Sequence, residues 1–148
     1  MVSTSTSIVR RDLTGWWLVS RTAQTFGLLV VVQAAHSAEE CWNRLWESFP
    51  PARFVAGLVS TDLARGFLLG NIVLVAFAAW CFFWPVRRQW TIAVPLLWFW
   101  VAIETINGVV HPLWSLREGG YTPGVATAPL LFFLAIYLAI QLRRRPTE

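Results

Sequence analysis

The sequence FGLLVVVQAAHSAEEC, residues 26–41, joins an apolar run to one imidazole and two carboxylates on a single helical pattern. Its first half is typical of a membrane-spanning helix, yet His36, Glu39 and Glu40 follow on the same pattern. An ionised side chain at the bilayer centre costs about 2.5–3.5 kcal/mol on insertion scales. These three titratable groups therefore need partners inside the fold, and they indicate a functional site.

The composition is that of an integral membrane protein. Of 148 residues, 56% are hydrophobic and only 14% are charged, whereas soluble domains carry about 25% charged residues. Ten Trp and ten Phe are typical of a protein with aromatic residues at both membrane interfaces. The net charge of +4 comes from arginines at the ends of apolar runs and not from a basic patch. The lipid bilayer is therefore the expected partner, and nucleic acid is not.

The apolar runs predict an all-α fold, a four-helix transmembrane bundle forming a single integral membrane domain over residues 1–148. The approximate spans are 22–46, 62–84, 89–111 and 125–142. Pro112 is expected to end the third span at His111, because proline disfavours helical geometry in the residue before it.

The N-terminal region and the basic residues predict how the chain lies in the membrane. Arg10 and Arg11 near Trp16 and Trp17 favour an interfacial segment over residues 1–20, with a frayed terminus as the alternative. Further arginines separate the second span from the third and follow the fourth. This bias places both termini in the cytoplasm.

Two of the predicted spans each carry three polar residues on one helical face: His36, Glu39 and Glu40 on the first, and Glu104, Asn107 and His111 on the third. The two spans run in the same direction. A rise of about 1.5 Å per residue then puts both sets at similar depth in the outer half of the bundle. Two helices thus each offer an imidazole and a carboxylate.

This donor set favours a metal site. Imidazole nitrogen and carboxylate oxygen bind Zn, Fe or Mn at about 2.0–2.2 Å, and a cation would neutralise buried carboxylates. We expect His36, Glu40 and His111 to be the primary ligands of one or two divalent ions. Glu39 or Glu104 would complete the site as ligand, bridge or general base. The alternative is a hydrogen-bonded cluster that holds helices together.

Three further residues are candidates for supporting roles. Tyr121 is either a residue of the aromatic belt or a catalytic proton donor at the mouth of the site. Asn107 and Asn71 are expected to hydrogen-bond to ligands or between helices, and not to bind metal directly.

Three short motifs, in this order, resemble the HXXEE-domain family of small bacterial membrane proteins. They are His36-Ser37-Ala38-Glu39-Glu40, then His111 with Asn107 four residues before it, then Tyr121-Thr122-Pro123-Gly124. The resemblance covers roughly residues 26–142. It implies a protein of the bacterial cytoplasmic membrane with a functional set made of His36, Glu39, Glu40, His111 and Tyr121. The resemblance indicates no substrate. Glu104 is a candidate on helix geometry alone and not through the resemblance.

The favoured hypothesis is a membrane-embedded metal-dependent enzyme that acts on a lipophilic small molecule, as a hydrolase with zinc or an oxidoreductase with an iron pair. One alternative is a metal-free acid–base isomerase or cyclase of a prenyl-type lipid, with Glu39 or Glu40 as the acid. Another is a proton-coupled carrier or binding module without enzymatic activity. Four short spans without an internal repeat argue against a carrier, unless the chain forms a homo-oligomer.

Overall fold

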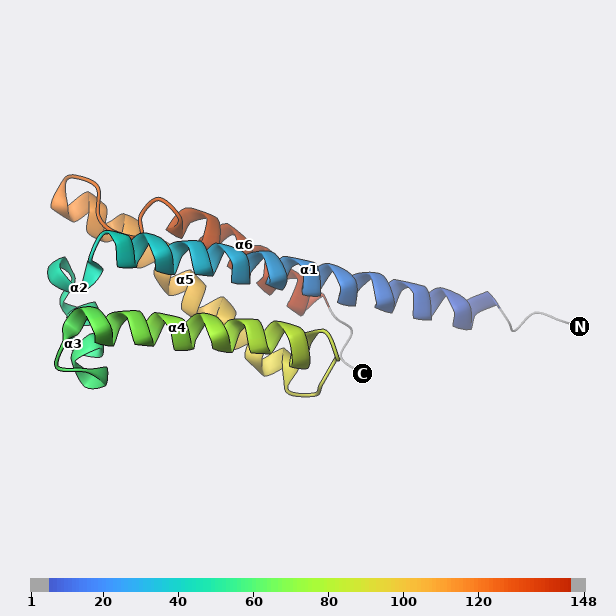
Figure 1. The fold of residues 1–148 in the computed structure, drawn as a ribbon. Helices are drawn as coiled ribbons and strands as arrows, with labels where there is room; N and C mark the ends of the chain where they lie inside the picture. Colours follow the sequence, from blue (N-terminus) through green and yellow to red (C-terminus); the bar gives the residue numbers. More distant parts are fainter. Residues whose placement is uncertain (1–5, 145–148) are drawn as a thin grey trace, which may run out of the picture.

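The computed structural model describes residues 6–144, with side chains described from residue 21 onward. These residues form an all-α fold of six α-helices and one π-helical segment, η1, shown in Figure 1. The elements are α1 (Thr6–Trp42), α2 (Leu45–Ser48), α3 (Pro50–Val59), α4 (Leu63–Cys81), η1 (Phe82–Val86), α5 (Ala93–Glu118) and α6 (Ala128–Arg143).

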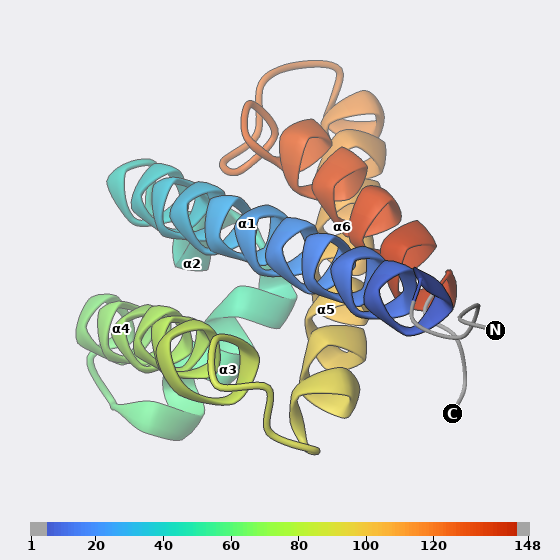
Figure 2. The same ribbon diagram turned by 90° about the vertical axis from the view of Figure 1, so that its right-hand side faces the viewer.

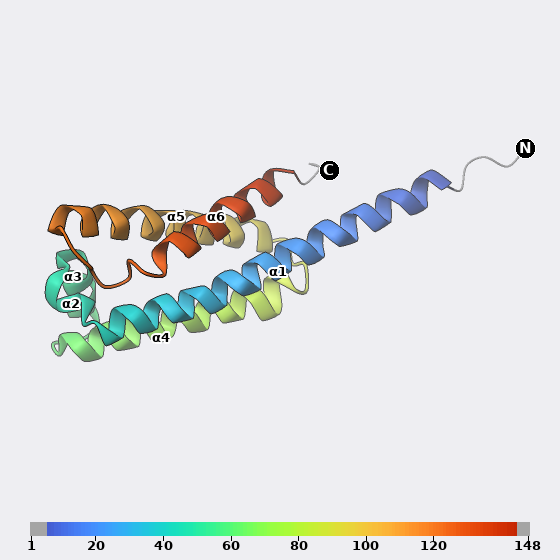
Figure 3. The same cartoon turned by 90° about the horizontal axis from the view of Figure 1, so that it is seen from above.

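Helix α1 is central to the packing. It contacts both α4 and α6, while α5 packs along α6 and α3 packs on α4, as the end-on view of Figure 2 shows. Its N-terminal part extends beyond the other helices (Figure 3). The predicted interfacial segment falls partly on residues 1–5, outside the described residues. From Thr6 onward the backbone continues α1 as one helix and not as a separate segment.

The C-terminal end of α1 lies at Trp42, four residues before the predicted end of the first span. Both the backbone amide and the side-chain amide of Asn43 donate to the carbonyl of Glu39, and Arg44 takes a left-handed φ of 54°. This turn redirects the chain into α2. Residues 50–59 then form α3, whose two prolines lie in its first turn, where no backbone hydrogen bond is lost.

Helix α5 continues through Pro112 to Glu118, so the prediction that Pro112 ends this helix at His111 is wrong. Proline removes only one backbone hydrogen bond, the one to the carbonyl of Gly108. The helix beyond it is stabilised by packing, because the ring of Trp114 lies 4.7 Å from that of Phe49. The left-handed Gly119, at φ 69°, then ends the helix.

Within residues 6–144, two segments are long and apolar enough to cross a membrane, 63–86 and 93–118. Helix α6 is apolar but has only 16 residues, and it begins at Ala128 because residues 121–127 form a loop. The all-α prediction is confirmed. These two segments do not by themselves make a bundle of four spans.

The apolar core has two parts, which flank the polar residues of α1. Phe26 and Leu29 belong to the larger cluster, which also includes Trp100 of α5. Leu45 and Trp46 belong to a smaller cluster with Phe67 of α4. His36 and its neighbours therefore lie on α1 between two packed apolar regions.

Candidate metal centre

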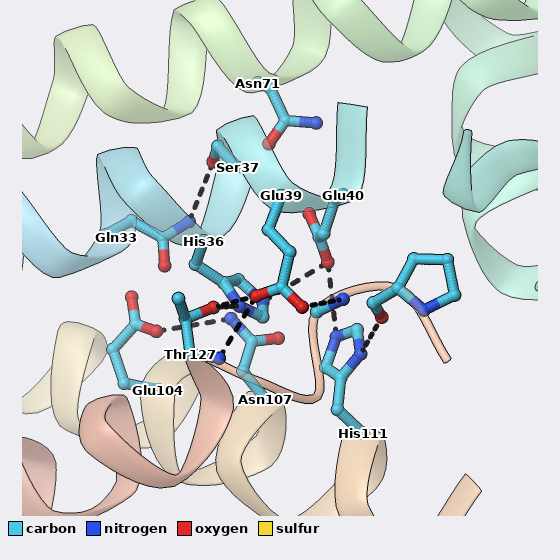
Figure 4. A network of polar contacts seen from close by, with 12 residues as sticks. Gln33, His36, Ser37, Glu39, Glu40, Asn71, Glu104, Asn107, His111 and Thr127 are labelled. Carbon is cyan, nitrogen blue, oxygen red and sulfur yellow. Dashed lines mark hydrogen bonds and ion pairs between the residues drawn. The ribbon is translucent and has the colours of Figure 1, made fainter. Parts of the chain in front are cut away.

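His36, Glu40 and His111 converge on one point between α1 and α5, as Figure 4 shows. His36 and Glu40 are one helical turn apart on α1, and His111 comes from the last part of α5. Glu40 Oε1 lies 3.3 Å from His36 Nε2 and 3.2 Å from His111 Nε2. The prediction from helical spacing, that these three side chains lie close together, is thus confirmed.

The group is well shielded from solvent. The side chains of His36 and His111 are 1% and 4% exposed, and that of Glu40 is 12% exposed. Their potential ligand atoms all lie within 4.8 Å of one another, and this is the one such group of three among the described residues. A buried carboxylate with two imidazole nitrogens aimed at it can hold a divalent cation.

The two imidazole rings are each held from the side opposite to Glu40. His111 Nδ1 lies 2.8 Å from the carbonyl oxygen of Pro123, and a carbonyl can only accept a hydrogen bond. His111 therefore carries a proton on Nδ1, which leaves a lone pair on Nε2 in the neutral ring. The rings of His36 and His111 meet edge to face, with centroids 4.8 Å apart.

His36 has an unpartnered nitrogen inside the cluster. Its Nδ1 lies 2.7 Å from Thr127 Oγ1. Its Nε2 is buried and makes no hydrogen bond to any described residue, because the contact with Glu40 at 3.3 Å lacks hydrogen-bond geometry. A buried polar atom without a partner is costly in a packed protein.

The loop of residues 121–127 approaches both rings closely, and Gly124 makes this approach feasible. Its φ is +89°, a conformation that favours glycine. A Cβ added there would lie 2.6 Å from the His111 ring and 2.9 Å from His36 Cε1. The glycine of the YxPG motif is therefore required by the two histidines as well as by the turn.

Glu39 faces this loop and not the three-residue group. Five hydrogen-bond donors reach its carboxylate at 2.6–3.1 Å. They are the Tyr121 hydroxyl, the backbone amides of Gly124, Ala126 and Thr127, and the Thr127 hydroxyl. Thr127 precedes the first turn of α6, so Glu39 also supplies negative charge at the N-terminus of that helix.

Tyr121 lies at the exposed edge of the site, with 60% of its surface accessible. Its hydroxyl donates to Glu39 Oε1 at 2.7 Å and accepts from the Asn43 side chain at 3.3 Å. Partial desolvation, the hydrogen bond to Glu39 and the charge of that carboxylate raise the pKa of Tyr121 to about 12. The phenol therefore stays protonated at neutral pH and serves as a donor to Glu39.

Glu104 belongs to a neighbouring polar cluster on the other side of His36, as Figure 4 shows. Its carboxylate is fully buried and accepts a hydrogen bond from Asn107 at 3.2 Å. As drawn in Figure 4, the Gln33 amide nitrogen donates to Ser37 Oγ at 3.2 Å and the amide oxygen faces Glu104. With the amide turned over, its nitrogen donates to both Glu104 oxygens at 3.0 Å and its oxygen accepts from Ser37 at 3.2 Å; we adopt this orientation because it pairs donors with acceptors. Glu104 is thus satisfied by amides and is not part of the three-residue group.

Asn71 is the predicted site residue that takes no part in these contacts. Its side chain donates to the carbonyl of Phe67 on its own helix at 3.2 Å. Asn107, in contrast, bonds to Glu104, as expected for a supporting residue.

Sequence reasoning missed Gln33 and Thr127. Gln33 precedes His36 by three residues on the same helical face, so the spacing rule applied to His36 and Glu40 includes it. Thr127 gave a weaker signal, a hydroxyl residue directly before an apolar helical run, which is typical of a helix N-cap.

Comparison with known proteins gives no identity for the chain, because no family model, curated protein or solved structure matches it. The buried cluster of His36, Glu40 and His111 is consistent with an HXXEE motif.

Proposed function

We propose that this protein is a membrane-embedded metalloenzyme whose ion is bound by His36, Glu40 and His111. The observation that carries the proposal is the convergence of two Nε2 atoms on one oxygen of Glu40, at 3.3 and 3.2 Å. In a tetrahedral site with bonds of about 2.0–2.1 Å, two ligand atoms are about 3.3 Å apart. The spacing in the protein is therefore that of two ligands on a common ion.

The protonation pattern supports a cation at this point. His111 carries its proton on Nδ1, so neutral His111 presents a lone pair to Glu40, which also presents lone pairs. Two acceptors at 3.2 Å repel each other unless a proton or a metal ion lies between them. A divalent ion also satisfies His36 Nε2, which makes no hydrogen bond.

Three protein ligands favour catalysis over a purely structural role. Structural zinc sites use four protein ligands, whereas catalytic sites use three, including sets of two His and one Glu, and leave a position for water or substrate. Zinc in such a site lowers the pKa of bound water to about 7 and generates a nucleophile. Hydrolysis is therefore the favoured reaction, and oxidation with iron would need an electron donor as well.

The surroundings favour a lipophilic substrate and a site within the bilayer. Only 22% of the apolar window of 63–86 and 33% of that of 93–118 are buried inside the protein, as expected for helices that face lipid. We infer that α1 and α6 complete a bundle of four spans, although α6, about 24 Å long, requires a locally thinned bilayer. The arginine pattern supports an arrangement with both termini in the cytoplasm, and the resemblance to the HXXEE-domain family supports a bacterial cell.

Metal analysis of protein purified in mild detergent tests the proposal. We expect about one zinc, iron or manganese ion per chain in the wild type and loss of that ion in His36→Ala and His111→Ala. Thr105→Val is a matched control on α5, because the Thr105 hydroxyl donates to the Val101 carbonyl of its own helix and not to the three proposed ligands. Metal-free wild-type protein, or metal retained in both histidine variants, contradicts the proposal.

Cysteine labelling in intact cells tests the membrane arrangement. Leu116→Cys lies at the outer end of α5 and Gln89→Cys lies between η1 and α5, in a background with Cys41 and Cys81 replaced. An impermeant reagent added outside is expected to label position 116 and not position 89. Labelling of both positions from the same side rules out the arrangement.

A second candidate function is metal-free acid–base catalysis, and Glu104 is the observation that favours it. With the Gln33 amide oriented as drawn in Figure 4, its oxygen faces this fully buried carboxyl, which can then hold a proton and donate it there. This candidate predicts a protein that is active without metal and is inactivated by Glu104→Gln.

A further inference from the structure

We propose that Glu39 is a positioning residue that fixes both histidines in the tautomer able to bind metal, by holding the loop of residues 121–127 against them. This inference rests on the proposed metal centre and assigns to Glu39 a role other than ligand. It is carried by the hydrogen bonds on the far side of each imidazole ring.

Both oxygens of the Glu39 carboxylate accept hydrogen bonds from the loop of residues 121–127. Five donors at 2.6–3.1 Å fill a group that has about four lone-pair positions. Such a set of donors stabilises an ionised carboxylate, which can only accept hydrogen bonds. Glu39 has no lone pair left for an ion, so its neighbour Glu40 is the carboxylate ligand.

The direction of the hydrogen bonds follows from this ionised carboxylate. Thr127 Oγ1 lies 2.6 Å from Glu39 Oε2 and must donate its proton there. The same hydroxyl oxygen then accepts from His36 Nδ1, 2.7 Å away. His36 therefore carries its proton on Nδ1 and presents the lone pair of Nε2 to the centre.

The same loop sets the second histidine. The amide of Gly124 donates to Glu39 at 3.1 Å. The carbonyl of Pro123, the preceding residue, accepts from His111 Nδ1 at 2.8 Å. One carboxylate thus determines the proton position on His36 through Thr127 and on His111 through the loop backbone. Fixing the ligand tautomer through the second ring nitrogen is how outer groups tune metal sites.

The imidazole tautomers can be measured directly, because the chain has two histidines only. We suggest ¹⁵N-histidine labelling of the whole chain in detergent, stripped of metal with a chelator. The wild type is expected to show a proton on Nδ1 of both rings. His36→Ala and His111→Ala assign the two sets of signals.

Three threonine variants separate positioning from packing. Thr127→Val removes the hydroxyl with little change in shape and is expected to mix the tautomers of His36 while leaving His111 unchanged. It should also weaken zinc binding by about 10–100-fold, the usual effect of losing an outer hydrogen bond. Thr127→Ser keeps the hydroxyl and should restore both properties. Thr122→Val, in the same loop, removes a buried hydroxyl without a hydrogen-bond partner and should change neither.

Three results overturn the inference: an unchanged His36 tautomer in Thr127→Val, equal defects in Thr127→Val and Thr127→Ser, or equal zinc affinity of the wild type and Thr127→Val. The failure of this inference is distinct from the failure of the metal centre. If zinc does not bind the wild type, the metal proposal fails, although the tautomers are still read from the metal-free protein. If zinc binds the wild type and Thr127→Val equally well, only the role of Glu39 and Thr127 is lost.

Discussion

Two buried carboxylates lie on either side of His36, and they are satisfied in different ways. Glu104 accepts hydrogen bonds from the amide nitrogen of Asn107 and, with the Gln33 amide turned toward it, from that of Gln33. Glu40 faces two imidazole nitrogens, one of which makes no hydrogen bond. The comparison indicates that the Glu104 cluster is complete with protein atoms alone. The centre at Glu40 is complete only with a further proton or cation, and this is the basis of the metal site that we propose.

The largest expected effect separates these two carboxylates. Glu40→Gln should reduce zinc affinity by more than about 100-fold, because it removes a charged ligand from a site with three. Glu104→Gln should leave zinc affinity within about twofold of the wild type, because Glu104 lies outside the group. Titration of metal-free protein with zinc gives both values. Equal losses in the two variants would mean that Glu104 is also a ligand and that the comparison is wrong.

A smaller effect is expected at Glu39, which adjoins Glu40 but faces the loop. Glu39→Gln places an amide group among five donors and should loosen the loop, with a loss of about 10–100-fold in zinc affinity. The bound cobalt spectrum should still indicate the same ligand set, because no ligand is removed. A changed ligand set in the cobalt spectrum would show Glu39 to be a ligand.

A third effect is expected on stability. Glu104→Leu leaves the donors of Gln33 and Asn107 without a buried acceptor, at a cost of about 1–3 kcal/mol for each unsatisfied group. The variant with Leu at positions 33, 104 and 107 removes donors and acceptor together and should recover part of this loss. Denaturant unfolding in detergent without metal provides the measurement. If the triple variant is no more stable than Glu104→Leu, the unsatisfied amides of Gln33 and Asn107 are not the cause of the lost stability.

Part of the site was accessible from the sequence because it depends on helical spacing. His36 and Glu40 are four residues apart, and a count of helix rise puts His111 at a similar depth on a parallel helix. Spacing could not assign the separate roles of Glu39 and Glu40. The two residues are adjacent, and their partners are set by whether α6 or α5 lies beside each one.

The contacts of the loop of residues 121–127 could not be predicted from the sequence, for a different physical reason. The partners of Glu39 are mainly backbone amides between Gly124 and Thr127, and the partner of His111 is a backbone carbonyl. Backbone groups have no sequence signature, so the YxPG motif indicated only a turn. The helix end at Pro112 was misplaced because the prediction considered local geometry and omitted the packing of Trp114 on Phe49.

X-ray absorption at the zinc edge of the zinc-loaded protein tests the central claim most directly. The account predicts an ion bound by nitrogen and oxygen atoms at about 2.0–2.1 Å, with the scattering pattern of two imidazoles. If His36→Ala still binds some zinc, the spectrum of that zinc should show one imidazole ligand in place of two. A spectrum without imidazole scattering in the wild type, or one unchanged in His36→Ala, would contradict a metal centre at this site.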